Sequence, residues 1–112
     1  MVYDKANELA ALIRESGEFK RYTAAKERIE AGSMADTLLK EYKKLQLRAQ
    51  AAMVSGETDE ECIQKLGKLG ELLQMDGEAS EFLMAEYSLS RLVGDVYRII
   101  AEACELDLSM LD

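Results

Sequence analysis

Apolar residues recur at helical spacing along nearly the whole chain. They stand three or four positions apart, which places them on one face of a helix rather than on alternate faces of a strand. Short polar or glycine-containing stretches interrupt this pattern at residues 16–17, 31–33, 55–57 and 76–77. The pattern therefore predicts an all-α protein of about five helices.

Two short helices are predicted at the N-terminus, over about residues 2–15 and 17–30. Ser16 is the predicted N-cap of the second helix, because a serine hydroxyl can accept a hydrogen bond from a backbone N–H of the first turn. Ser33 is predicted to cap the next helix in the same way, with Asp36 at its third position.

Three longer helices are predicted at about residues 34–54, 58–75 and 78–104, in an antiparallel arrangement. Thr58 and Glu61 make a T-x-x-E pattern, which predicts a capping box at the start of the fourth helix.

The chain length limits the architecture. A chain of 112 residues is predicted to form a single helical domain over residues 1–112, with a frayed tail over residues 105–112. A thin helical bundle exposes much of its surface and can complete its core against another chain. We therefore expect a homodimer or a higher oligomer.

The last predicted helix carries the widest apolar stripe. Apolar residues repeat every seven positions in it, with a second set three positions later, which is the spacing of a heptad seam. The stripe is too broad for a simple two-helix hairpin to cover. It supplies the candidate core or self-association residues Phe82, Leu89, Leu92, Val93, Val96 and Ile100.

Three glycines, Gly67, Gly70 and Gly94, lie inside predicted helices. Each costs about 1 kcal/mol of helix stability relative to alanine. One interpretation, which we favour, is that they let another helix approach closely. The other is that they mark a locally less stable part of the helix.

The composition argues against catalysis. The chain has no histidine, the side chain most used for acid–base work near neutral pH and the commonest metal ligand. A ferritin-type di-iron site with its Glu-x-x-His ligands is therefore excluded. The sequence also contains no glycine-rich phosphate loop and no G-x-S-x-G motif. We expect a protein that is not an enzyme and that has no catalytic residue, metal or cofactor.

The net charge of −8 is unevenly distributed. Residues 1–50 contain 10 basic and 8 acidic residues, whereas residues 51–112 contain 4 basic and 14 acidic residues. No apolar stretch approaches the ~20 residues that a membrane span requires, and the N-terminus lacks a signal-peptide pattern. We therefore expect a cytoplasmic protein with no membrane contact.

The two cysteines, Cys62 and Cys104, are predicted to lie far apart. A hairpin of the fourth and fifth helices would separate them by roughly 20 Å, too far for a disulfide or a shared metal. Cys62 fits a small apolar core residue. For Cys104, an inter-subunit metal or redox role stays open as an alternative.

One basic stripe offers a second kind of function. Lys40, Lys44 and Arg48 stand four residues apart in the third predicted helix, with Lys43 alongside. Such a stripe can face an acidic protein or an RNA backbone, although a solvated helix face is the simpler interpretation. An RNA-binding module is the alternative to a protein-binding adaptor, and a purely structural, self-associating protein is another.

The ordered set of segments resembles the YlbF/YmcA family of small helical regulators from Gram-positive bacteria. Ala6 begins an A-x-x-L-A pattern, and Ile13 begins an I-x-x-S-x-E-aromatic-x-x-aromatic pattern that ends at Tyr22. The resembling segments are residues 3–10, 13–22, 42–46, 81–86 and 99–103, together with Gly56 in the hairpin turn.

The resemblance implies an all-helical protein that assembles with itself or with family paralogues. It also implies a regulatory adaptor without catalysis of its own, acting in competence, sporulation and biofilm formation through a complex that influences RNase Y and mRNA processing.

Overall fold

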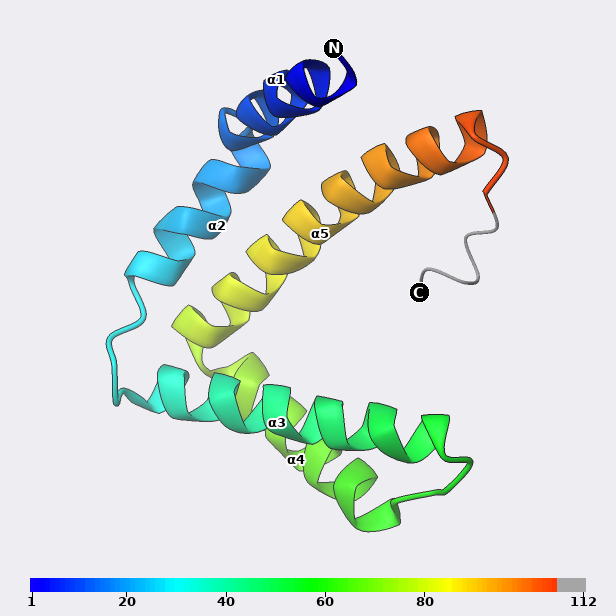
Figure 1. The fold of residues 1–112 in the computed structure, drawn as a ribbon. Helices are drawn as coiled ribbons and strands as arrows, with labels where there is room; N and C mark the ends of the chain where they lie inside the picture. The colour runs from blue at the N-terminus through cyan, green and yellow to red at the C-terminus, as the bar shows by residue number, and fades with distance from the viewer. Residues whose placement is uncertain (107–112) are drawn as a thin grey trace. The chain divides into compact units, whose positions relative to one another are not determined.

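The computed structural model describes residues 1–106 and contains five α-helices within them, with no strand (Figure 1). The all-α prediction is confirmed. The tail predicted to fray falls largely on residues 107–112, which lie outside the described residues. The helices are α1 (Val2–Arg14), α2 (Gly17–Glu27), α3 (Met34–Val54), α4 (Glu60–Met75) and α5 (Gly77–Ala103).

The chain divides into two compact units. The hairpin unit comprises residues 25–83, and the terminal unit comprises residues 1–24 together with the chain from residue 84 onward. Helix α5 contributes its first turns to the hairpin unit and the remainder to the terminal unit.

The hairpin unit is built on the packing of α4 against α3, the two helices drawn in green in Figure 1. Leu73 is 2% exposed and Cys62 is fully buried, so the expectation that Cys62 serves as a core residue is confirmed. Partly buried residues from α3, including Leu38, Leu39 and Tyr42, pack around this core. Its buried members are Ala35, Leu45, Cys62, Leu69, Leu73 and Ala79.

A tight turn reverses the chain after α3. Gly56 has a φ of +76°, a left-handed conformation that a side chain disfavours. The Gly56 N–H donates to the Met53 carbonyl at 3.1 Å, and the Glu57 N–H donates to the Ala52 carbonyl at 2.8 Å. This pair of bonds is a Schellman motif, which satisfies carbonyls at the C-terminal end of α3.

Both predicted serine caps are confirmed. The Ser33 hydroxyl accepts from the Asp36 N–H at 3.1 Å, and the Asp36 carboxylate accepts from the Gly32 N–H at 2.9 Å. This exchange satisfies two backbone donors at the start of α3. At α2, the Ser16 hydroxyl accepts from the Phe19 N–H at 3.2 Å.

The predicted capping box at Thr58 and Glu61 is wrong. Asp59 is the N-cap of α4, and its carboxylate accepts from the Cys62 N–H at 3.1 Å. The other oxygen of Asp59 accepts from Nε of Arg48 in α3 at 2.8 Å. Asp59 therefore both caps α4 and links it to α3. Thr58 has no charge and could not form the ion pair with Arg48.

The terminal unit has little core of its own. Helix α1 contains no buried residue. In the part of α5 that belongs to this unit, Ala85 and Ala101 are the buried residues among those described. Among residues 1–106, every large apolar side chain of the unit therefore stays at least partly accessible to water.

The interior glycines do not serve close packing within the chain. A Cβ atom built at Gly67, Gly70 or Gly94 would meet no neighbouring atom within 4 Å. Close packing inside either unit is therefore not the role of these glycines, and close packing against a helix of another chain stays a prediction.

Replacing Leu73 by alanine should destabilise the protein by about 2–5 kcal/mol, because it removes a buried side chain and leaves a cavity. Leu72→Ala is the matched control, since Leu72 is 52% exposed on the same helix. Chemical denaturation followed by helical circular dichroism, at one protein concentration, measures both variants. Equal losses of unfolding free energy in Leu73→Ala and Leu72→Ala would contradict the position of the core.

Asp59→Ala should cost about 1 kcal/mol or more, because it removes both the α4 cap and the partner of Arg48. Asp59→Asn keeps a capping oxygen and loses only the charge, so its cost should be smaller. Thr58→Ala is the control, with an expected change within about 0.5 kcal/mol. If Thr58→Ala lowered the free energy of unfolding as much as Asp59→Ala does, the predicted capping box at Thr58 and Glu61 would be supported instead.

Candidate functional site

The predicted self-association residues fall into two groups by exposure. Leu89, Leu92 and Val96 are half-buried in the terminal unit, and Phe82 is half-buried in the hairpin unit. Val93 and Ile100 are more open, with 46% and 51% of their surface exposed. The sequence pattern thus combined residues that the folded chain partly covers with residues that it leaves to solvent.

Val93 and Ile100 belong to an exposed apolar line on α5. Tyr97 lies between them at helical spacing and is 49% exposed. Positions i, i+4 and i+7 share one face of a helix, so the three side chains form a continuous surface. We call Val93, Tyr97 and Ile100 the α5 surface. Tyr97 was missed as a site residue, although its spacing from Val93 was a usable signal.

A polar hollow of about 330 Å³ lies within the terminal unit. Its charged lining consists of Glu18 from α2 and of Arg91 and Asp95 from α5. The sequence did not predict this hollow, because it forms only where α2 meets α5. Its remaining lining residues are Tyr87, Ser88 and Leu92.

Two members of the predicted basic stripe are held in ion pairs. Lys40 contacts the Asp36 carboxylate at 3.0 Å, and Arg48 contacts the Asp59 carboxylate at 2.8 Å. Two hydrogen bonds lower the pKa of Asp36. The bond from the Gly32 N–H has the larger effect, and the bond from Lys40 has the smaller one. Lys43 and Lys44 are exposed and form no ion pair within residues 1–106.

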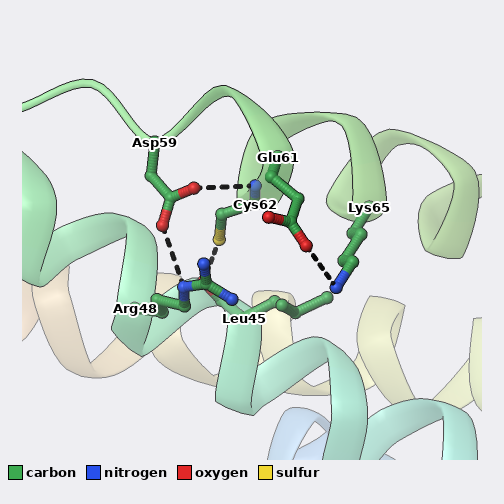
Figure 2. A network of polar contacts seen from close by, with 6 residues as sticks. All are labelled: Leu45, Arg48, Asp59, Glu61, Cys62 and Lys65. Atoms are coloured by element: carbon green, nitrogen blue, oxygen red, sulfur yellow. Dashed lines mark hydrogen bonds and ion pairs between the residues drawn. The ribbon is translucent and has the colours of Figure 1, made fainter.

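The region where α3 meets the start of α4 is a polar network around Cys62 (Figure 2). Asp59 links Arg48 to the Cys62 backbone, and the Cys62 thiol donates to the Leu45 carbonyl at 3.2 Å. Cys104, just after the end of α5, is exposed.

Glu61 and Lys65 form a further pair on α4 beside this network (Figure 2). Their charged atoms are 2.9 Å apart, and the hydrogen bond from Lys65 lowers the pKa of Glu61. This pair neutralises part of the acidic start of α4.

Within residues 1–106, no three cysteine, aspartate or glutamate side chains are placed to hold a metal ion. In the same part of the chain, no helix combines the length and the hydropathy that a bilayer span needs. Two surfaces stand out in this part of the chain: the exposed apolar residues of α5 and the charged end of the α3–α4 hairpin.

Comparison with known proteins gives consistent matches along the chain. Residues 2–105 match the sequence model of the YlbF/YmcA family, described as control of competence regulator ComK. The UPF0342 protein of Symbiobacterium thermophilum is 37% identical over 108 residues, which cover 96% of each chain.

Two further relatives match over similar lengths. The UPF0342 protein of Alkalihalophilus pseudofirmus is 39% identical over 105 residues, 93% of this chain and 89% of its own. That of Caldicellulosiruptor saccharolyticus is 36% identical over 106 residues, 94% of this chain and 88% of its own. Because the family match spans all five helices, the chain belongs to the YlbF/YmcA family of regulators.

Proposed function

We propose that this protein is a non-catalytic, cytoplasmic regulatory adaptor that acts through protein–protein contacts and self-associates through α5. The observation that carries the proposal is the α5 surface, where Val93, Tyr97 and Ile100 are each about half exposed. Removing apolar surface from water contributes roughly 25 cal/mol per Å², so a partner that covers these side chains gains stability.

The small core of the terminal unit supports this proposal. Its helices α1 and α5 leave their large apolar residues partly accessible, and α1 has no buried residue. A second copy would bury the α5 surface and complete a core that one chain builds only in part. Leu89, Leu92 and Val96 would then lie in or beside that core.

Family membership supports the regulatory side of the proposal. The family is described as controlling a competence regulator. By its resemblance, the chain would act in development, competence or biofilm formation through mRNA processing, with family paralogues or an RNase complex as partners. The basic stripe gives weaker support for RNA binding, because Lys40 and Arg48 already have carboxylate partners.

Ile100→Glu should shift the protein toward monomer, because association would then have to desolvate a carboxylate. We expect the dissociation constant to rise roughly tenfold or more. Met84→Glu is the matched control: Met84 is also on α5 and is 51% exposed, as Ile100 is. Light scattering across a concentration series measures the mass, and circular dichroism checks that the helices remain.

A wild-type chain that is monomeric at every concentration would contradict self-association. So would an Ile100→Glu variant that associates as tightly as Met84→Glu. Neither result depends on identifying a partner.

The adaptor role is tested by pull-down from the host's own lysate with tagged wild-type and Ile100→Glu protein. We expect the wild type to recover family paralogues or components of an RNase complex. A stable homo-oligomer that recovers neither would contradict the adaptor and leave the purely structural alternative.

A further inference from the structure

The hairpin unit has an apolar groove where α3 gives way to α4. Its volume is about 210 Å³, and its large exposed apolar side chains are Met53, 80% exposed, and Ile63, 58% exposed. We call it the tip groove. Its lining residues are Ala49, Ala52 and Met53 from α3, Glu57, Thr58 and Asp59 from the connection, and Ile63 from α4.

The side chains around the tip groove are suited to binding rather than to folding. Val54, next to Met53, is 91% exposed, so the end of α3 presents two large apolar side chains to water. Neither contributes to the buried core that holds α3 and α4 together. Methionine is unbranched and polarisable, and it adapts to partner side chains of different shapes. An amphipathic helix binds an apolar groove through anchors three or four residues apart, which is one of the recurring modes of peptide recognition.

The rim of the groove carries excess negative charge. Residues 57–61 include four acidic side chains, of which Asp59 and Glu61 are paired with Arg48 and Lys65. Within residues 1–106, Glu57 and Glu60 form no ion pair. A partner that presents lysine or arginine beside its apolar anchors would complement both features of this surface.

We propose that the tip groove binds a positively charged amphipathic helix of a partner protein. The partner's apolar anchors contact Met53 and Ile63, and its basic residues face Glu57 and Glu60. This inference rests on the proposed function only in that both concern protein contacts. It uses residues of the hairpin unit, whereas self-association uses α5, so the two can fail separately.

The probe is a synthetic peptide of about 18 residues, five helical turns, with leucine at positions i, i+3, i+4 and i+7 and lysine elsewhere. A second peptide carries glutamate in place of every lysine. Fluorescence anisotropy measures binding of each labelled peptide to the full chain at low and high salt. The lysine peptide should bind and weaken as salt rises, and the glutamate peptide should not bind.

Ile63→Ser should weaken binding of the lysine peptide roughly tenfold, a loss typical of an interface anchor. Leu72→Ser is the matched control, because Leu72 is similarly exposed on α4 but does not line the groove. The double variant Glu57→Gln, Glu60→Gln should also bind more weakly and depend less on salt. Light scattering should show the same oligomeric state for Ile63→Ser as for the wild type.

Equal affinities for Ile63→Ser and Leu72→Ser would overturn the inference, as would equal binding of the lysine and glutamate peptides. Binding that Ile100→Glu abolishes and Ile63→Ser leaves intact would also overturn it, because the peptide would then occupy the α5 surface. An intact self-association with loss of peptide binding in Ile63→Ser would support the tip groove alone.

Discussion

The packing of α4 against α3 is the interaction on which the hairpin unit depends. Cys62, Leu69 and Leu73 place one face of α4 in the buried core, and Leu45 comes from α3. At the open end of this core, Asp59 joins the two helices by accepting from the Cys62 backbone and from Arg48. A hydrophobic contact thus fixes which faces meet, and the polar network fixes where along the helices they meet.

The terminal unit lacks an equivalent core. Its buried residues on α5 are the small Ala85 and Ala101, whereas the larger apolar residues stay half-buried or exposed. A small side chain buries little apolar area, so this unit gains less from folding alone. Its remaining apolar area is available for a contact between chains. Association through that area would also stabilise the folded state of the unit.

The helices were predictable because their signals are local. Ser16 and Ser33 each cap the helix that follows directly in sequence, and the bonds that they make span three residues. The start of α4 was misplaced because Thr58 and Asp59 are both acceptable caps. Asp59 is the cap because it also pairs with Arg48. Arg48 is 11 residues away in the sequence, and only the folded α3–α4 hairpin brings it within hydrogen-bond distance of Asp59. The predicted helix pattern said nothing of that distance.

The candidate surfaces were predictable only in part, for the same reason. The period of α5 identified Val93 and Ile100, but their exposure depends on which neighbours the chain supplies. The tip groove was missed because Met53 and Ile63 come together only after the α3–α4 turn closes. The available sequence signal was a methionine close to a glycine turn and an acidic run, and it is weak on its own.

Electrostatics separates the two surfaces that result. Around the α5 surface, Asp95 and Arg98 lie 3.6 Å apart and offset each other's charge, so contact there depends mainly on apolar area. The tip groove instead lies beside four acidic residues, two of which have basic partners. At 0.1 M salt, interactions between exposed charges more than about 10 Å apart are largely screened. Apolar burial does not depend on charge and is not weakened in this way. Under these two proposals, ionic strength would change the occupancy of the tip groove and leave self-association through α5 in place, so one small chain would keep a constant assembly and exchange its partner.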